Sequence, residues 1–412
     1  MSGSISQRGT DQGTIQAGHY LWIVLLLLFG ATLAHALMWQ GLPVLYPFIQ
    51  NEFELSRAQV GFITSSKSIG VGAVVILAGW LTDTLGVKRM ITISLLSLTA
   101  FTLAFPLAHS FSVIIALAVL IGIALSPAHP ATSRAVMDWF PSRIRALAMS
   151  FKQIGMPIGG ALMAAVLPSL AIVIGWRMAA AVTGLLVLVI AIAFLLLYRD
   201  APRSLHPVHK FNLATLHTIL RKPVLVATII WGAIFIGFQF IVLSYFMLFL
   251  IEELGLSLIM AGGLLAIAQV SSSISRILWG AASDFIFRGR RAVVLALIGF
   301  ITVIWMLGAS LMSVGNPSTT VYLIAIVIGI STLSFHGVYI TLIGERAEEG
   351  QVGVTIGVSS TVNNLSQMVM PPLFGYLVDV TDSYSLGWRA SAVVALVCTL
   401  ALLVFGRESQ RR

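Results

Sequence analysis

Two stretches of the sequence repeat one pattern: Val119–His129 reads VLIGIALSPAH, and Ile326–His336 reads IVIGISTLSFH. The offset between them is 207 residues, and it aligns a glycine at the fourth position and a histidine at the last. Both stretches are apolar enough to lie in membrane-spanning helices. A repeat with this period predicts that the chain consists of two copies of one unit.

Two further matches occur in the same order along the chain. Asn51–Gly61 (NEFELSRAQVG) resembles Glu252–Gly262 (EELGLSLIMAG) at an offset of 201, and the Gly-Trp-Arg at 175–177 recurs at 387–389 at an offset of 212. Each match alone is short. Three matches in order, with slowly rising offsets, predict a duplication of the whole unit.

The composition identifies lipid as the solvent of this unit. Of the 412 residues, 58% are hydrophobic and 9% are charged, whereas soluble domains have about 25% charged residues. We therefore expect an all-α membrane protein with twelve transmembrane helices, built as two pseudo-symmetric six-helix bundles of the same orientation. The apolar runs that predict these helices are residues 20–49, 57–82, 89–108, 112–138, 144–173, 178–198, 223–250, 258–283, 292–313, 319–343, 352–379 and 390–406.

The longest polar break, residues 199–222, predicts a cytoplasmic linker between an N-terminal bundle (1–198) and a C-terminal bundle (223–412). If the N-terminus is cytoplasmic, seventeen of the 24 Lys and Arg residues fall on the cytoplasmic side and three on the other. Basic residues collect in cytoplasmic loops. This bias predicts a multi-pass protein of the cell (plasma) membrane with both termini in the cytoplasm. It also accounts for the net charge of +9 without a nucleic-acid partner.

The connection between the second and third runs reads GWLTDTLGVKRM, from Gly79 to Met90. Its helix-ending acid, turn glycine and basic pair resemble the signature of the major facilitator superfamily, although the usual basic residue after the acid is Thr84 here. The second half carries a related Gly-Ala-Ala-Ser-Asp at 280–284 followed by basic residues. The resemblance covers nearly the whole chain. It implies a secondary transporter that works by alternating access.

The resemblance also implies a latch at the cytoplasmic end of each bundle. A carboxylate at a helix end can pair with basic loop residues and with the positive N-terminus of a neighbouring helix. Ordinary interfacial charge is the alternative. The residues that we expect to gate the cytoplasmic side are Asp83, Lys88, Arg89, Arg134, Asp138, Asp284, Arg288 and Glu345.

Besides Arg134, three basic residues lie inside the predicted spans: Lys67, Lys152 and Arg276. Every Asp and Glu lies near a span end or in a loop. A charge at mid-membrane costs about 2.5–3.5 kcal/mol even on the lenient scale, so these cations must face water, carbonyls or a bound anion. We expect them to bind an anionic substrate. A snorkelling or carbonyl-bound structural role is the alternative.

The sequence that begins with Arg276 (RILWGAASD) also resembles helix 8 of oxalate:formate and monocarboxylate transporters, in which an arginine at this spacing binds the substrate carboxylate. Lys67 is similar in position to a cation in helix 2 of the phosphate- and nitrate-type transporters of the superfamily. The resemblance thus implies a small organic anion, a carboxylate, as the substrate. His35, Trp39 and Asn363 complete the expected substrate site. His35 is either a proton carrier or an interhelical hydrogen-bonding group, and the same alternatives hold for the two repeat histidines.

We expect no enzyme, because the sequence has no nucleophile–base pair, no metal-ligand cluster and no phosphate-binding loop. No cofactor is expected. The expected partners are a small anionic substrate, a coupling proton or counter-anion, and the lipid bilayer, and the protein is expected to be a monomer. The main alternative is a drug or metabolite efflux porter of the same superfamily, but a cationic drug would require an acid in the cavity. A non-transporting membrane receptor is less favoured.

Overall fold

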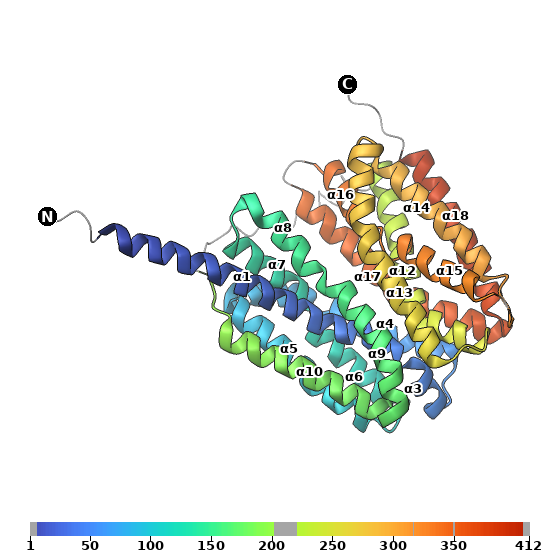
Figure 1. Ribbon diagram of the computed structural model, residues 1–412. Coiled ribbons are helices and arrows are strands. Elements are labelled where there is room, and N and C mark those ends of the chain that lie inside the picture. The colour runs from blue at the N-terminus through green and yellow to red at the C-terminus, as the bar shows by residue number, and fades with distance from the viewer. Residues whose placement is uncertain (1–5, 202–220, 316, 349–350, 407–412) are drawn as a thin grey trace.

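The computed structural model describes residues 6–201, 221–315, 317–348 and 351–406. These residues form helices joined by short connections, and no strand occurs among them. The predicted all-α fold class is confirmed. Figure 1 shows the helices of the first half, blue to green, beside those of the second half, yellow to red.

The first half contains the helices that precede residue 198. They are α1 (Ser6–Trp39), α2 (Gly41–Val44), α3 (Tyr46–Phe53), α4 (Arg57–Leu85), α5 (Val87–Ala104), the 3-10 turn η1 (Phe105–Leu107), α6 (Phe111–Leu125), α7 (Ala128–Trp139), α8 (Ser142–Gln153), α9 (Gly155–Ile174) and α10 (Trp176–Leu197).

The second half has the same plan. Its helices are α12 (Pro223–Glu252), α13 (Leu258–Ala281), the π-helical turn η2 (Ala282–Ile286), α14 (Arg291–Ala309), α15 (Ser318–Ile330), α16 (His336–Arg346), α17 (Val352–Thr381) and α18 (Tyr384–Phe405).

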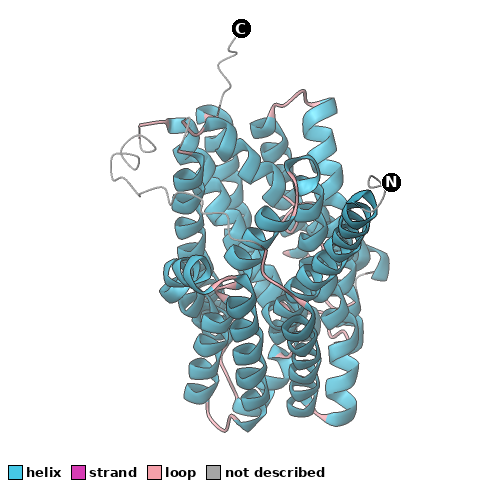
Figure 2. Cartoon of the chain, turned by 90° about the vertical axis from the view of Figure 1, so that its left-hand side faces the viewer, coloured by secondary structure: helices cyan, strands magenta, loops and turns pink. Residues whose placement is uncertain are grey.

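Most helices run along one direction, and their connections gather at two opposite ends (Figure 2). We call the end where α4 meets α5 the inner end and the end where α3 meets α4 the outer end, after the orientation that the charge bias predicts. Nine helical segments of the described chain are long and apolar enough to cross a membrane. The α4 helix, the α15–α16 pair and α17 occupy the other three predicted positions, and the count of twelve spans stays a prediction.

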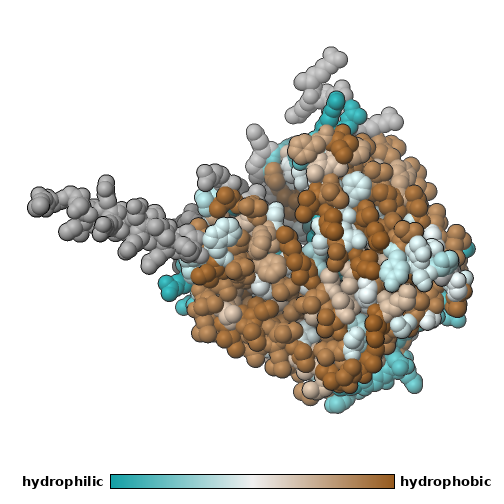
Figure 3. Space-filling model, viewed as in Figure 1, coloured by the Kyte–Doolittle hydropathy of each residue, from teal (hydrophilic) through white to brown (hydrophobic). Residues whose placement is uncertain are grey.

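The surface of the bundle is apolar, as Figure 3 shows for one face. Side chains such as Val173 and Phe285 are 80% and 85% exposed. In water such a surface would drive association. In a bilayer this surface contacts lipid tails. The apolar residues are therefore suited both to the core of the bundle and to its lipid-facing surface.

The duplication is visible where equivalent helices begin. Ser56 and Ser257 are related by the offset of 201 and are the N-caps of α4 and α13. Each side chain accepts a hydrogen bond from the backbone N–H three residues later, at 3.2 Å from Gln59 and 3.3 Å from Met260. A serine cap satisfies one of the free N–H groups of a helix start. The repeated Leu-Ser of the sequence thus starts the equivalent helix in both halves.

The duplication is also visible in the packing. A Cβ added to Gly122 of α6 would lie 2.1 Å from the carbonyl oxygen of Lys67. A Cβ added to Gly329 of α15 would lie 2.2 Å from the carbonyl oxygen of Ala268. The residues are related by the same offsets, 207 and 201. Only glycine, which has no Cβ, permits this approach. This explains why both halves have a glycine at the equivalent position.

Two equivalent helices are broken in the middle. The run predicted at 112–138 is divided between α6 and α7, and the run at 319–343 between α15 and α16. Pro127 stands at the first break, where it cannot continue a helical hydrogen-bond ladder. Both breaks leave a half-helix N-terminus inside the bundle.

At the outer end, Arg177 joins three segments of the first half. Its guanidinium is ion-paired with Glu52 of α3, and its Nε donates to the carbonyl of Pro106 at 3.0 Å. The Trp176 Nε1 also donates to Glu52, at 2.6 Å. The hydrogen bond from Arg177 lowers the pKa of the Glu52 carboxyl below its ordinary value.

We predict a pH-dependent loss of stability for Glu52→Gln. A carboxyl whose pKa is lower in the folded state stabilises above its unfolded pKa, near 4.3, and this contribution disappears as the pH falls through the folded pKa. The variant should melt roughly 1–3 °C below the wild type at pH 7, and this difference should be smaller at pH 3.5, which lies below the unfolded pKa. Melting in detergent checks this, with the exposed Glu54→Gln as control. A deficit of equal size at both pH values would contradict it.

Candidate functional site

Lys152 lies on α8 with 1% of its surface exposed. Its Nζ donates to Thr132 Oγ1 at 2.8 Å and to Ser133 Oγ at 2.9 Å, both on α7. These hydroxyls are neutral acceptors. They satisfy two of the three N–H groups of the ammonium and leave its charge uncompensated.

Arg276 lies on α13 and reaches the break between α15 and α16. Its Nε and Nη2 both donate to the carbonyl of Leu333, at 3.3 and 3.0 Å. The Ser272 hydroxyl donates to the same carbonyl at 2.7 Å. The guanidinium is therefore positioned by a neutral group, as the ammonium of Lys152 is.

The half-helices α7 and α16 begin beside these cations. Their N-cap positions are held by Pro127 and Phe335, whose side chains cannot accept a hydrogen bond. His129 and His336 stand in the first turns and are exposed. Ten residues separate each histidine from the inner end of its helix, or ~15 Å. Each imidazole thus lies deep in the bundle with part of its surface not covered by neighbouring side chains.

These four residues form one group. His336 is close enough to interact electrostatically with Arg276 and with His129, and His129 interacts in the same way with Lys152. Each half contributes one histidine and one stronger cation. We name His129, Lys152, Arg276 and His336 the central cation cluster.

Lys67, predicted to bind the substrate, lies apart from this cluster. It is 1% exposed, and its Nζ donates to the carbonyl of Trp39 at 3.1 Å, with the Trp39 and Tyr46 ring centroids at 5.6 and 6.0 Å. Its backbone packs on Gly122, ten residues or ~15 Å further out than the level of Thr132. The sequence placed both lysines in one site, and the structure separates them along the membrane axis.

The other predicted substrate residues divide between these two places. His35 is 3% exposed, and its ring nitrogens lie 2.5 Å from the Ala31 carbonyl and 2.8 Å from Ser94 Oγ. This is the interhelical hydrogen-bonding role that the sequence left open. Trp39 lies with Lys67 and packs edge-on against Phe240 of the other half, at 5.6 Å.

Asn363 is connected to the cluster through a tyrosine. Tyr339 donates to Asn363 Oδ1 at 3.3 Å and is hydrogen-bonded to Ser359 Oγ at 2.6 Å. The Tyr339 ring lies 6.2 Å from the His336 ring. Neutral polar groups of α16 and α17 thus adjoin the cationic ones.

The predicted gate residues of the second half meet at the inner end. Arg291, a residue that the sequence did not select, bonds to Asp284 at 2.9 Å and to Glu345 at 2.8 Å. Arg288 is exposed and has a left-handed backbone with φ of 51°. Both acids were expected gate residues, but their basic partner in the structure is Arg291 rather than the expected Arg288.

In the first half, Arg134 Nε donates to both carboxylate oxygens of Asp138 at 3.0 Å. The Lys88 backbone N–H donates to Asp200 at 2.8 Å, and the Arg89 side chain is exposed. The side chain of Asp83 lies outside the described residues. At the inner end, the ion pairs formed by Arg134 with Asp138 and by Arg291 with its two acids each stay within one half.

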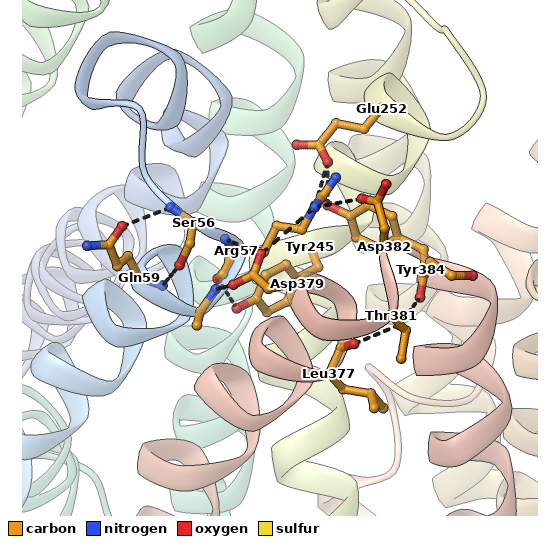
Figure 4. Close-up of polar contacts among 12 residues, drawn as sticks. Ser56, Arg57, Gln59, Tyr245, Glu252, Leu377, Asp379, Thr381, Asp382 and Tyr384 are labelled. Atoms are coloured by element: carbon orange, nitrogen blue, oxygen red, sulfur yellow. Dashed lines mark hydrogen bonds and ion pairs between the residues drawn. The ribbon is translucent and has the colours of Figure 1, made fainter.

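The outer end is held by a second latch, which the sequence analysis missed (Figure 4). Arg57 of α4 pairs with three acids of the other half: Glu252 at 2.9 Å, Asp382 at 3.3 Å and Asp379 at 3.8 Å. Asp379 also accepts the backbone N–H groups of Arg57 and Ala58, at 2.9 and 2.8 Å. One half thereby caps a helix of the other. We name Arg57, Glu252, Asp379 and Asp382 the outer latch.

Further polar contacts close the outer half of the interface. Thr64 is hydrogen-bonded to Ser244 at 2.8 Å, and the Gln269 amide donates to Gln40. Each bond joins the two halves. The two halves are therefore in direct polar contact from the outer latch down to Gln40 and Gln269.

Known protein families share the sequence features of this architecture. The sequence model of the Major Facilitator Superfamily matches residues 28–365. The chain belongs to the major facilitator superfamily. The family signature was thus interpreted correctly, and the chain is a multi-pass membrane transporter rather than an enzyme.

Individual relatives agree with this assignment. The chain is 24% identical over 400 residues to the "Hexuronate transporter" of Bacillus subtilis (strain 168), covering 93% of this chain and 94% of the relative. It is 25% identical over 419 residues to the "Probable galactarate/D-glucarate transporter GarP" of Escherichia coli (strain K12), covering 93% and 94%. A bacterial homologue of the human lysosomal transporter Spinster has the same fold, with a TM-score of 0.79 at 17% identity, over 94% of this chain and 96% of that one.

We predict that Asp379→Ala opens the outer end. The substitution removes both acceptors at the start of α4, and loss of a helix cap costs about 0.5–2 kcal/mol, which corresponds to a roughly 2- to 30-fold shift toward the open form. The reporter is Ser244→Cys in a Cys398→Ala background, whose reaction rate with a small thiol reagent should rise by this factor. Asp382→Ala removes an acid whose side chain is 87% exposed and should have a smaller effect. An unchanged rate for Asp379→Ala would contradict the latch.

Proposed function

We propose that this transporter carries a small organic anion, an acid sugar, by alternating access, with the central cation cluster as the binding site. The observation that carries the proposal is the pairing of Lys152 and Arg276 with neutral acceptors. A cation inside a membrane protein is costly without a counter-charge. Every Asp and Glu of the sequence lies at a span end or in a loop. A bound anion supplies the negative charge that Lys152 and Arg276 lack as a partner.

The half-helix N-termini support the same assignment. In transporters with broken helices, the positive ends of half-helices face anionic groups of the substrate. Here α7 and α16 begin beside Lys152 and Arg276 without a side-chain cap. Two helix ends and two full charges therefore favour negative charge at one place.

The neutral polar groups beside the cluster favour a hydroxylated acid. Tyr339 and Asn363 offer donors and acceptors next to His336, and Thr132 and Ser133 do so beside Lys152. The relatives named for hexuronate and for galactarate and D-glucarate transport are in accord with such a substrate. An acid sugar places a carboxylate and several hydroxyls within one molecule.

The conformational cycle uses the two latches in turn. The described form is closed at the outer end by the outer latch. When the halves rock, these contacts part and the gate acids of the inner end, Asp138, Asp284 and Glu345, engage across the halves. In this proposal the bundles 1–198 and 223–412 move as units around the linker 199–222. Both termini lie in the cytoplasm, and the protein acts as a monomer in the plasma membrane.

Counterflow in proteoliposomes tests this function. Vesicles loaded with D-glucarate, galactarate or a hexuronate should accumulate the same labelled acid by exchange. Neutral hexoses, amino acids and phosphate esters serve as comparison substrates. Exchange of acid sugars above empty vesicles supports the proposal, and exchange of neutral or cationic compounds alone overturns it.

We predict that Arg276→Lys weakens binding although the charge is kept. A guanidinium holds a carboxylate by two parallel hydrogen bonds, whereas an ammonium acts as a point charge. Loss of one charge-assisted bond, about 1.5–3 kcal/mol, corresponds to a roughly 10- to 100-fold higher Kd for the transported acid. Isothermal titration measures this, with the exposed Arg389→Lys as control. Equal affinity of Arg276→Lys and the wild type would place the anion elsewhere.

We predict that Lys67→Gln weakens anion binding without lowering the stability of the empty protein. Lys67 is a buried charge held by one carbonyl and two rings, and neutralising it removes a desolvation cost. Because Lys67 lies outside the central cation cluster, its charge acts on the anion only at long range. The Kd for the acid sugar should therefore rise at most several-fold, while the melting temperature in its absence stays equal or increases. A large fall in that temperature with unchanged Kd would assign Lys67 a structural role.

A further inference from the structure

We propose that His129 and His336 form a proton-binding site, so that the anion crosses the membrane together with a proton. This inference rests on the proposed function of the central cation cluster and adds its coupling ion. The two histidines share one place in the duplicated architecture. Each lies in the first turn of the inner half of a broken helix, and the offset of 207 relates them.

Access and proximity distinguish this pair from other histidines in the bundle. Both side chains are exposed, and the two imidazoles interact electrostatically with each other across the halves. His35 is instead 3% exposed with both ring nitrogens engaged. A proton carrier must exchange with water on alternate sides of the membrane, and the pair lies at the interface where the halves move.

The charged groups that face His129 come from the helices packed against α7. On α8 this is Lys152, which interacts with the imidazole. On α7 itself, Arg134 and Asp138 form an ion pair nearer the inner end. The titratable group of α1 is His35, which is hydrogen-bonded as described above. Lys67 of α4 lies nearer the outer end. The charged residues of α5, Lys88 and Arg89, lie at the inner end of that helix.

The groups that face His336 come from the helices packed against α16. On α13 this is Arg276, which interacts with the imidazole, and on α16 it is Tyr339 one turn away. On α14 it is Arg291, engaged with Asp284 and Glu345 at the inner end. The acids of α12 and α17, Glu252 and Asp379, belong to the outer latch. The strongest neighbours of both histidines are thus cations.

This environment couples proton to anion. In the empty site, an imidazolium would add a positive charge beside Lys152, Arg276 and two helix N-termini, so the neutral form is favoured. A bound carboxylate compensates those charges and accepts a hydrogen bond from a protonated imidazole, which favours the charged form. The proton comes from water on the side to which the site is open, binds one ring nitrogen of the pair, and returns to water on the other side when the anion leaves. No covalent bond of the substrate changes.

Proton uptake on binding tests the site directly. In weakly buffered detergent solution with a pH indicator, D-glucarate added to the wild type at pH 7 should remove about one proton per bound anion from the medium. The double variant His129→Asn, His336→Asn should remove none, and His109→Asn, which changes an exposed outer histidine, should behave as the wild type. Binding by the wild type without proton uptake overturns the proposal.

Vesicle transport separates this inference from the proposed function. Counterflow requires no net movement of protons, so exchange of labelled D-glucarate by the wild type tests the proposed function alone. The double variant changes two members of the binding cluster, so its exchange should be slower than that of the wild type, and its melting temperature in detergent shows whether it is folded. Uptake driven by an acid outer medium should occur in the wild type and be lost in the variant. Acid-driven uptake by the double variant overturns the histidine assignment. Absence of counterflow by the wild type with every acid sugar overturns the proposed function and the inference with it.

Discussion

The architecture depends on one electrostatic constraint. Among the described residues, Lys152 and Arg276 lie inside the bundle and form no ion pair with an acidic side chain. Lys152 and Arg276 are held by hydroxyls and a carbonyl, which orient the charges without compensating them. Retaining such groups costs several kcal/mol of solvation in a membrane. The cost is offset when an anion enters, and an anion that binds one conformation better than the other shifts the equilibrium between them.

Duplication provides the geometry that this constraint needs. Glycines at equivalent places bring equivalent helices into contact, and serines at equivalent places start them. Equivalent breaks leave a half-helix N-terminus in each half. The outer ends are different, because one arginine of the first half meets three acids of the second. The repeat histidines and the two helix breaks are therefore related by the duplication, whereas the outer closure is not. A rocking motion can open one end without disturbing the packing within either half.

Sequence reasoning predicted the class of the protein because the strongest signals were periodic or compositional. The repeat offsets, the apolar runs and the signature at 79–90 specified a two-half transporter fold. The helix breaks were missed because apolar runs continue through them, although Pro127 was a signal. The outer latch was missed because Arg57 and Asp379 are 322 residues apart and each looks like ordinary interfacial charge. Lys67 was grouped with Arg276 because depth along a helix does not tell where a long side chain points. The roles of the predicted substrate and gate residues remain proposals.

The most direct test of the central claim is an experimental structure with D-glucarate or a hexuronate bound in the inward-open form. The account predicts a carboxylate oxygen of the substrate ~2.7–2.9 Å from the Arg276 guanidinium, with Lys152 and the two repeat histidines in the same shell and hydroxyls near Tyr339 and Asn363. A substrate bound away from these residues, with Arg276 still on the Leu333 carbonyl and Lys152 still on Thr132 and Ser133, would contradict it.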